Sequence, residues 1–537
     1  MHTTRRALRR FARSLNFRDF NVSFVQRGAL GLDPRPLTSN KNNTAVPFLW
    51  NIADQDSTRN SALSRTFARD FSTATAKKPP EPQGLPVFGT MLALISAGGA
   101  EKLHEYVDKR HRELGPVYRE QIGPVRAVFV NSPDEYRKIL IDLAGPTPLH
   151  FLPESWQLYN ELRAKNRGLL FMDGQEWWRH RQILNKVMLK PDPMKFLCAP
   201  CQEAAKNLAE KWKTYSRAGC TVPDLQYQLY QWSIEVMLAT MIGSRWRDCK
   251  PQLRSDIEYV AMMVHQIFKC SATLSMIPAK LAMKLRLPVW TQFVKTVDTV
   301  LDRVHNLVPE MIQMSDGDGL MQIIINHGIS SDMTSRIITD FIIAAGDTTS
   351  VTMQWVLLLL SSHPELQNQL FHNIKDLSVK ETLQHQLLRS IWREALRLHP
   401  VAPFLTRYLP TDAIIGDYLV PKGELIIISL YSSSRDEKYF LRPNEFWPER
   451  WIKIEKLSGT SSHYQGVKDA RASIPFAVGL RNCIGRRLAE TQLSLTLAEL
   501  IKNFKIECEN RDSIEMILHM VSVPSKPIKL KLSNRET

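Results

Sequence analysis

The stretch Pro475–Glu490 reads PFAVGLRNCIGRRLAE and places one cysteine, Cys483, between two glycines. The residues before Cys483 predict a tight turn, and those after it predict an amphipathic helix. Gly479 permits the sharp turn, and Gly485 leaves room for a flat object beside the backbone. A thiolate here would meet the positive end of the helix and the free N–H groups of its first turn, which predicts a lowered pKa for Cys483.

Haem is the flat group that this loop fits. The Cys483 thiolate would be its axial ligand, and the guanidinium of Arg481 would lie near a propionate. The alternative is a buried structural cysteine, which is the commoner role of a lone cysteine in a loop. The complete pattern F-x-x-G-x-R-x-C-x-G favours haem. Its residues are Phe476, Gly479, Arg481, Cys483 and Gly485.

The loop closely resembles the haem-binding loop of the cytochromes P-450, the haem-thiolate monooxygenases, and its ending Gly485–Glu490 resembles their mitochondrial branch. The resemblance extends from Gly84 to the C-terminus. It implies a mainly α fold with a small β component and a long central helix, in which residues 90–537 form the catalytic domain. It also implies heme b, whose iron is held by Cys483, and a cofactor contact from Phe476.

The composition is that of a globular protein, with 44% hydrophobic and 23% charged residues in a chain of 537. No stretch reaches the roughly 18 uninterrupted apolar residues of a transmembrane helix. A formal net charge of +16 would suit a nucleic-acid partner, but much of the excess lies at the N-terminus, where residues 1–50 carry nine arginines and lysines against two aspartates. We therefore expect no nucleic-acid partner.

The N-terminal stretch has the composition of a mitochondrial transit peptide. Leu8, Phe11, Leu15 and Phe20 recur near helical spacing among the arginines, and an Arg-rich, acid-poor amphipathic leader is typical of such peptides. The alternative is a disordered basic tail that binds nucleic acid or membrane. We expect residues 1–76 to be a transit peptide and disordered leader.

Local patterns outline the rest of the chain. Residues 77–89 are proline-rich and predict a stiff hinge before the fold begins. The seven cysteines suggest no disulfide framework, and we interpret the C-x-x-C pair Cys198 and Cys201 as incidental. The chain is expected to be mostly helical up to about residue 400. The patterns predict helices at Glu101–Leu114 and from Ser132-Pro133 onward, strands at Val117–Glu120, Ala127–Val130 and within Ala413–Leu430, and a last hairpin after Ile514.

Asp332–Leu360 predicts one long apolar helix with Ser331 as its cap. The run Ala344–Ser350, AAGDTTS, puts a carboxylate and several hydroxyls in its middle. Such groups are costly inside an apolar helix unless they are paired or take part in chemistry. The alternative is a solvent-facing stripe, or hydroxyls that bond back to the preceding turn.

The family resemblance assigns chemistry to two of these residues. It implies that Asp347 and Thr348 are the catalytic acid–alcohol pair that delivers protons to dioxygen. The chain has Ala345 where the family usually has glycine. We expect Gly346, one position later, to open the helix locally.

Glu394 and Arg397 form an E-x-x-R pattern, whose spacing places both side chains on one helix face. The pattern alone is common on surface helices. Arg450, in Pro448-Glu449-Arg450, stands before Cys483 at the distance typical of the family. The resemblance implies that Glu394, Arg397 and Arg450 form a buried structural triad that braces the haem loop.

Trp177 and Arg181 form W-x-x-x-R, and one helical turn places both side chains on one side. The resemblance implies that their N–H groups hold a haem propionate, and that Arg407 is a further propionate-binding arginine. The alternative for each residue is an ordinary surface position.

Four arginines resemble the redox-partner surface of the mitochondrial branch. Arg389 and Arg393 stand just before Glu394, where this branch usually has two lysines, and Arg486 and Arg487 follow Cys483. The resemblance implies docking of an acidic adrenodoxin-like ferredoxin, itself reduced by an NADPH-dependent reductase. The alternative is a set of solvated charges.

Ile277–Trp290 mixes basic and apolar residues between two prolines. Such a segment suits a peripheral position on anionic lipid, here the matrix side of the inner mitochondrial membrane. The alternative is a core helix whose lysines extend to solvent.

The resemblance is strongest to insect mitochondrial ecdysteroid 2-hydroxylases, on the stretches Gly84–Glu101, Phe341–Ser350 and His399–Thr411. It implies a steroid substrate, 2-deoxyecdysone, hydroxylated at carbon 2; another sterol or lipid position is the alternative. Two other classes of protein are alternatives to a monooxygenase. A haem-thiolate isomerase or peroxide-using enzyme typically lacks the acid–alcohol pair, and a haem sensor needs neither that pair nor a ferredoxin surface.

Overall fold

The computed structural model describes the chain from residue 77, and these residues belong to one compact unit. The transit peptide expected over residues 1–76 lies outside the described residues. The described residues are 77–535, except for 164–167, 190–196, 250, 316, 318 and 455–462.

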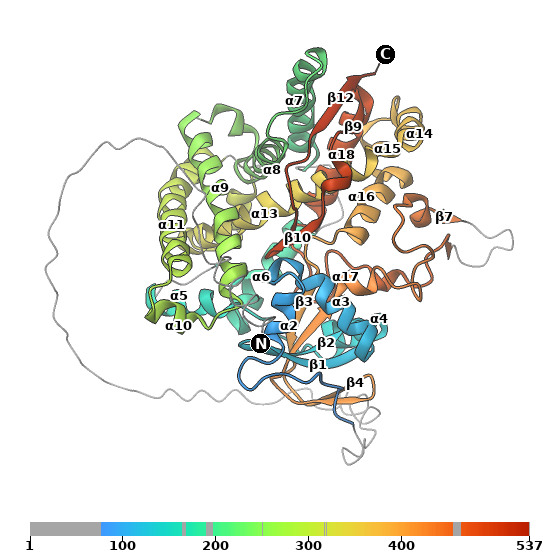
Figure 1. Ribbon diagram of the computed structural model, residues 1–537. Helices are drawn as coiled ribbons and strands as arrows, with labels where there is room; N and C mark the ends of the chain where they lie inside the picture. The colour runs from blue at the N-terminus through green and yellow to red at the C-terminus, as the bar shows by residue number, and fades with distance from the viewer. Residues whose placement is uncertain are drawn as a thin grey trace, which may run out of the picture. The chain divides into compact units, whose positions relative to one another are not determined.

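Most of the described chain is helical, as predicted, and the helices surround α13 (Ser331–Leu360). Figure 1 shows α13 in the middle of the helical body, with α8, α9 and α11 on one side of it and α16 and α18 on the other. The other helices are α2 (Met91–Ser96), α3 (Leu103–Leu114), α4 (Pro133–Arg137), α5 (Glu154–Arg163), α6 (Gly174–Met188), α7 (Cys198–Arg217), α8 (Leu225–Ile242), α9 (Pro251–Leu274), α10 (Ala279–Lys284), α11 (Pro288–Met314), α12 (Leu320–Asn326), α14 (Pro364–Ile374), α15 (Val379–Gln384), α16 (Gln386–Leu398), α17 (Leu430–Ser433) and α18 (Arg486–Asn503).

The central helix α13 begins one residue earlier than its sequence pattern indicated. Its cap is Ser330, whose hydroxyl accepts a hydrogen bond from the backbone N–H of Met333 at 3.3 Å, so the prediction of Ser331 as the cap was wrong. By length and composition α13 is also the one described helix that could cross a membrane, but 83% of its most apolar window is buried inside the protein. A core helix passes the same test.

Gly346 does not interrupt α13, which continues as α-helix on both sides of it. The expected local opening is therefore absent. A Cβ atom at this position would lie 2.3 Å from the hydroxyl oxygen of Tyr230 on α8. The glycine lets the tyrosine ring pack directly against the middle of the helix, which explains why no larger residue stands there.

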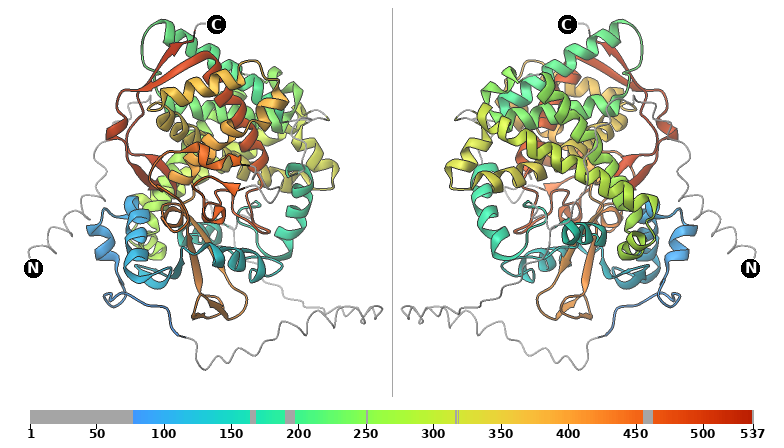
Figure 2. Two further views of the ribbon diagram at one scale, coloured as in Figure 1. Left: turned by 90° about the vertical axis from the view of Figure 1, so that its right-hand side faces the viewer. Right: turned by 90° about the vertical axis from the view of Figure 1, so that its left-hand side faces the viewer.

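The sheet component is small and comes from both ends of the chain. A four-stranded sheet has the order β1-β2-β6-β3; β2 and β6 are parallel, with Ala127 opposite Leu425, and the other pairs are antiparallel. Figure 2 shows this sheet and the β4–β5 hairpin at one side of the helices. The expected strands and the hairpin after Ile514 are confirmed. The strands are β1 (Val117–Ile122), β2 (Val125–Val130), β3 (Phe404–Tyr408), β4 (Ala413–Ile415), β5 (Tyr418–Val420), β6 (Leu425–Ser429), β7 (Lys453–Ile454), β8 (His463–Tyr464), β9 (Phe504–Cys508), β10 (Met516–His519), β11 (Val521–Pro524) and β12 (Leu530–Asn534).

Residues 77–89, predicted as a hinge, bond to strands of two sheets, β5 of the β4–β5 hairpin and β1 of the four-stranded sheet. The backbone N–H of Leu419 donates to the carbonyl of Lys77 at 3.0 Å, and that of Arg119 donates to Pro80 at 2.9 Å. Proline removes a donor but keeps its carbonyl, so a proline-rich segment can still accept bonds at a sheet edge. The segment is attached to the body instead of preceding it as a free linker.

Candidate active site

The loop that carries Cys483 is held tightly by backbone contacts. The Cys483 N–H donates to the carbonyl of Phe476 at 2.9 Å, which closes the turn. Gly479 has φ +82°, and a Cβ atom there would come within 2.3 Å of the Leu140 carbonyl oxygen. Only glycine fits both the left-handed conformation and the close approach. The structure thus supports the predicted tight turn before α18.

Cys483 is an exposed residue, but many protein atoms lie around its sulfur. Burial raises the pKa of its thiol, and this effect outweighs the lowering by the Gly485 N–H, Arg181 and Arg486. The expectation of a lowered pKa, which considered only the helix terminus, was therefore wrong for the free thiol. A metal ion bonded to the sulfur would deprotonate it outright.

Three arginines gather beside this loop from different elements. Arg181 comes from α6, Arg407 from β3, and Arg481 from the cysteine loop itself. Burial lowers the pKa of each to about 10, and the charge of Arg481 lowers the pKa of the other two further. They form a positively charged cluster in a dry region of the protein.

The described partners of this cluster leave its charge largely uncompensated. Arg181 donates to the carbonyl and the side-chain oxygen of Asn482 at 2.5 and 2.6 Å. Arg407 donates to the Thr406 carbonyl at 2.7 Å, and within the described residues its buried Nε has no partner. Arg481 pairs with the half-exposed Asp173. Buried cations are costly without anionic partners, so this donor set fits a group with two carboxylates, such as haem.

Trp177 belongs to the same cluster. Its indole is buried, and the Arg481 guanidinium lies 4.2 Å from the ring centroid, close enough for a cation–π contact. Arg181 follows one helical turn later on α6 and is also buried. The structure therefore brings together the W-x-x-x-R pair, Arg407 and Arg481, which lie far apart in the chain.

His150 is a member of the cluster that the sequence motifs missed. Burial and the charges of Arg481 and Arg407 lower its pKa to about 3, so the imidazole is neutral. Both of its ring nitrogens are buried without a hydrogen-bond partner in the described part of the chain. Arg481 Nε donates to the Pro148 carbonyl at 2.6 Å, which draws this loop against the cluster. No pattern around His150 signals this contact.

A small accessible patch interrupts the buried surface of α13. From Ile337 to Leu360 every residue is buried except Ala344, Ala345 and Thr348. The Thr348 hydroxyl donates to the Ala344 carbonyl at 2.8 Å, and its lone pairs remain free to accept. This accessible patch lies at the expected position of the acid–alcohol pair.

Asp347, the neighbour of Thr348, is buried on another side of α13. Burial raises the pKa of its carboxyl to about 7. Its Oδ2 atom has no hydrogen-bond partner among the described residues, and its Oδ1 lies 3.9 Å from Nδ1 of His265 on α9. A carboxyl with this pKa is present in both protonation states near neutral pH.

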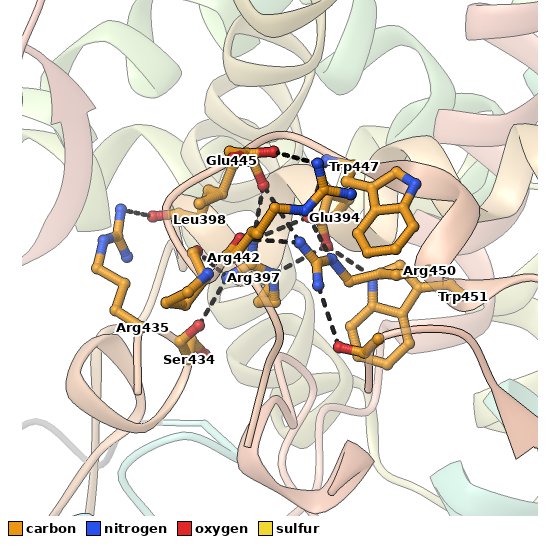
Figure 3. Close-up of polar contacts among 12 residues, drawn as sticks. Glu394, Arg397, Leu398, Ser434, Arg435, Arg442, Glu445, Trp447, Arg450 and Trp451 are labelled. Carbon is orange, nitrogen blue, oxygen red and sulfur yellow. Dashed lines mark hydrogen bonds and ion pairs between the residues drawn. The ribbon is translucent and has the colours of Figure 1, made fainter. Parts of the chain in front are cut away.

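Glu394, Arg397 and Arg450 meet in a fully buried group (Figure 3). Glu394 Oε1 accepts from Arg397 Nη2 at 2.8 Å and from Arg450 Nε at 2.9 Å. Trp451, which the motif did not include although it directly follows Arg450, donates its indole N–H to Glu394 Oε2 at 2.8 Å. The arginines also donate to backbone carbonyls, those of Ser434, Pro443, Glu445, Leu441, Gly466 and Arg442.

Three of the four predicted redox-partner arginines line one surface cleft of about 660 Å³. Arg389, Arg393 and Arg486 line it together with Phe476 of the cysteine loop, while Arg487 is not among its lining residues. Arg393 is not a freely solvated charge, because its guanidinium lies 3.8 Å from the ring centroid of Trp451. Arg389 is exposed, and Arg486 bonds to Glu490 at 2.8 Å.

Comparisons with known proteins identify the family of this chain and agree with its fold. A family model described as Cytochrome P450 matches residues 79–532. Cytochrome P450 315a1, mitochondrial, of Drosophila melanogaster is 36% identical over 496 residues, which cover 88% of this chain and 92% of its own length. The mitochondrial 1,25-dihydroxyvitamin D(3) 24-hydroxylase of Rattus norvegicus is 25% identical, with coverages of 92% and 99%. The mitochondrial cholesterol side-chain cleavage enzyme of Oncorhynchus mykiss is 25% identical, with coverages of 95% and 98%.

The chain therefore belongs to the cytochrome P450 family, a family of haem-thiolate proteins. Within that family it is a mitochondrial-type monooxygenase, similar over nearly its whole length to relatives that are named as mitochondrial.

Proposed function

We propose that this enzyme hydroxylates a steroid, 2-deoxyecdysone at carbon 2, in ecdysteroid hormone biosynthesis, using dioxygen and electrons from a ferredoxin. The observation that carries the oxygenase part is the buried arginine cluster beside the Cys483 loop. The substrate rests on the resemblance to the insect ecdysteroid 2-hydroxylase known as shadow, and the 36% identity to a mitochondrial Drosophila P450 is compatible with it. The alternative is another sterol or lipid position.

Heme b would be held by residues from three parts of the chain, α6, β3 and the cysteine loop. Cys483 Sγ would bind its iron, and Arg181, Arg407 and Arg481 would neutralise its propionates, with Trp177 supporting Arg481. Phe476 closes the turn around Cys483 through its carbonyl. When bound, the haem supplies the iron that activates dioxygen.

Asp347 and Thr348 would deliver protons in this reaction. A general acid works best when its pKa lies near the working pH, and burial brings the pKa of Asp347 to about 7. Thr348 keeps its hydroxyl on the accessible patch of α13. The two residues are consecutive on α13 and lie on different sides of it: Asp347 is buried, and Thr348 lies at the accessible patch.

An apolar cavity, whose described lining residues include none of α13 or of the Cys483 loop, would accept an apolar molecule such as a steroid. It has a volume of about 280 Å³ and lies between the four-stranded sheet, α9 and the β10–β11 hairpin. Leu103, Ile122, Phe129, Phe404 and Met520 are among its lining side chains. Apolar walls with few polar groups favour a rigid hydrocarbon skeleton over a charged metabolite.

Electrons would arrive through the arginine-lined cleft. An adrenodoxin-like ferredoxin, reduced by an NADPH-dependent reductase, would bring negative charge to Arg389, Arg393 and Arg486. Phe476 lines the same cleft, and its carbonyl accepts a hydrogen bond from the Cys483 N–H. A protein docked in the cleft would therefore be close to the loop that carries the thiolate. Arg487 would add to the positive field from the edge of the cleft.

Peripheral attachment to the matrix side of the inner mitochondrial membrane would use α10. Leu281 and Leu285 are 47% and 60% exposed, which argues against a core helix, and Lys280 and Lys284 are exposed beside them. Leu85, Val87 and Phe88 are exposed as well. Gly123 links these three residues to the region of α10. Its N–H donates a hydrogen bond to the Phe88 carbonyl, and a Cβ atom added at Gly123 would lie 3.7 Å from the carbonyl oxygen of Met276. Apolar and basic side chains together suit anionic lipid.

The experiment has two stages. The reduced carbon-monoxide complex should give the red-shifted Soret band of a thiolate-bound haem; Cys483→His should abolish it and all monooxygenase activity, whereas Cys220→Ser, at an exposed cysteine, should not. A normal spectrum from Cys483→His would end the haem assignment. Turnover of a sterol panel with ferredoxin and its reductase should then give the 2-hydroxylated product from 2-deoxyecdysone. A product only from another sterol or lipid would support the alternative substrate.

A further inference from the structure

A row of ionisable side chains leads from the surface to the buried carboxyl of Asp347. Asp347 Oδ1 lies 3.9 Å from His265 Nδ1, and the ring centroids of His265 and His519 are 6.0 Å apart in an edge-on arrangement. His519 Nε2 lies 3.1 Å from Glu101 Oε1. None of the other three residues in this row, His265, His519 and Glu101, belongs to a motif that the sequence reveals.

Four elements that are distant in the chain build this row. Asp347 lies on α13, His265 on α9, His519 at the end of β10, and Glu101 in the short 3₁₀ helix η2 (Ala100–Lys102). α9 packs against both α13 and β10, and β10 packs against η2. The row therefore depends on the packing of the C-terminal hairpin against the N-terminal part of the domain.

The two ends of the row differ in their contact with water. The Asp347 side chain is 3% exposed, and its Oδ2 atom has no hydrogen-bond partner in the described part of the chain. The Glu101 side chain is 55% exposed. A buried acid that gives up protons repeatedly must be resupplied from solvent, and this row is a connection of the required kind.

We propose that His265 is a proton-relay residue that resupplies Asp347 from the surface at Glu101 and His519. This proposal deepens the proposed function, on which it rests, because it takes Asp347 as the acid of the oxygenase reaction. His265 does not touch the reacting atoms; it acts through Asp347.

The charge states of the surrounding groups suit this role. Burial, His519 and Lys269 lower the pKa of His265 to about 4, so at neutral pH the imidazole is uncharged. Such a ring accepts a proton at one nitrogen while it releases one from the other. Tyr230, which faces Asp347 from α8, keeps its proton because burial raises its pKa well above 10. His265 is therefore the better of the two for proton exchange.

The transfer balances without any oxidant or reductant. The N–H bond at His265 Nδ1 breaks and an O–H bond forms on the Asp347 carboxylate, while a solvent hydronium ion on the Glu101 side protonates the other ring nitrogen and becomes water. Exchange of the ring proton with solvent then returns a proton to Nδ1, so the ring is unchanged over the cycle. The gap of 3.9 Å exceeds a direct hydrogen bond. A water molecule or a small side-chain rotation closes such a gap, and His265 is accessible enough for water at 33% exposure.

The test follows the proton on Asp347 directly. In the haem-loaded full-length enzyme, the infrared carbonyl band that Asp347→Asn removes is assigned to Asp347, and its hydrogen–deuterium exchange is timed. His265→Gln keeps a polar side chain of similar size but does not titrate. We expect this variant to slow the exchange roughly tenfold or more, because a positioned acid–base group typically accelerates proton transfer by about 10²–10⁴-fold. His372→Gln, at an exposed histidine on α14, is the control.

Turnover supplies the second measurement. His265→Gln should lower the product formed per NADPH and increase peroxide, and free imidazole should restore coupling in His265→Ala. Unchanged exchange, or unchanged coupling, overturns the relay while the proposed function stands. Weaker substrate binding with normal exchange assigns His265 to substrate recognition instead and also overturns it. Full coupling in Asp347→Asn overturns both the relay and the proposed role of Asp347.

Discussion

Arg450 Nε donates a hydrogen bond to Glu394 Oε1 at 2.9 Å across 56 residues of sequence, and neither side chain has any exposed surface. Glu394 also accepts from Arg397 and Trp451, so one carboxylate compensates two buried guanidinium groups. This contact ties α16 to the 3₁₀ helix η5 (Pro448–Trp451), which leads toward the cysteine loop.

Removing the charge of Glu394 should unfold this part of the protein. Glu394→Gln leaves Arg397 and Arg450 buried without an anion, which typically costs about 3–5 kcal/mol. We expect a large fall in the denaturant midpoint and poor haem retention. Glu445→Gln is the matched control, because its pair with Arg442 is exposed on both sides and worth at most about 1 kcal/mol. Equal effects of the two changes would contradict the structural role of Glu394.

Thr348→Ala should uncouple electron use from product formation. The variant keeps the fold, because the hydroxyl it loses donates only to the Ala344 carbonyl one turn back. Substrate and dioxygen should still bind, while peroxide rises and product per NADPH falls. Thr348→Ser, which keeps the hydroxyl, should stay near wild type. If Thr348→Ala is as well coupled as wild type, the residue is structural.

Asp347 should make stability depend on pH. Its pKa is raised from 3.8 to about 7 in the folded protein, so the folded state binds more protons than the unfolded state between these values and its stability falls as pH rises through them. As pH rises from about 4 to 7, the free energy of unfolding of Asp347→Asn should increase relative to wild type by about 1.4 kcal/mol per pH unit. His265 changes stability in the opposite sense below pH 6.5, so the difference between variant and wild type is the quantity to measure. A pH-independent difference would mean that Asp347 is ionised.

The cleft at Arg389 should set the affinity for ferredoxin. Arg389→Glu should raise the apparent KM for ferredoxin several-fold at low salt, with normal substrate-induced spectral shifts, because an exposed charge mainly changes the encounter rate. The exposed Arg112 on α3 provides Arg112→Glu as a control of equal charge change. Arg393 is less suitable, since its reversal would disturb Trp451 beside Glu394. Reduction of Arg389→Glu at the wild-type rate would place docking elsewhere.

The exposed leucines in and directly after α10 should hold the protein on membranes. Each leucine side chain that is fully buried in lipid would contribute about 1.5–3 kcal/mol to the free energy of membrane binding, and changing Leu281 and Leu285 to serine removes this contribution. We expect the double variant to leave cardiolipin-containing vesicles in a flotation assay, with unchanged thermal stability. Leu441→Ser, at another half-exposed leucine, should remain bound. Wild-type retention of the double variant would argue against α10 as the contact.

Local patterns were sufficient where the governing contacts lie within a few residues. The turn before Cys483, the pairing of β1 with β2, and the helix α13 each depend on nearby glycines, alternation or apolar periodicity. The cap of α13 fell one residue away from its prediction, because Ser330 and Ser331 are equivalent in pattern and only geometry separates them. The pattern of residues 77–89 did not predict that this segment bonds to the body of the protein, because its hydrogen bonds go to strands that come later in the chain.

The amino-acid pattern alone identifies the residues that could perform the chemistry: one thiol in a glycine-bounded loop, an acid beside an alcohol in an apolar helix, and arginines at matching positions. The environment of these residues depends on how distant segments pack around them. This packing set His150 beside Arg407 and Arg481, His265 beside Asp347, and Arg393 against the ring of Trp451. It also raised the pKa of the Cys483 thiol against the expectation from its own helix. The reason is desolvation, which depends on atoms from distant segments that crowd around a group and which no local pattern records.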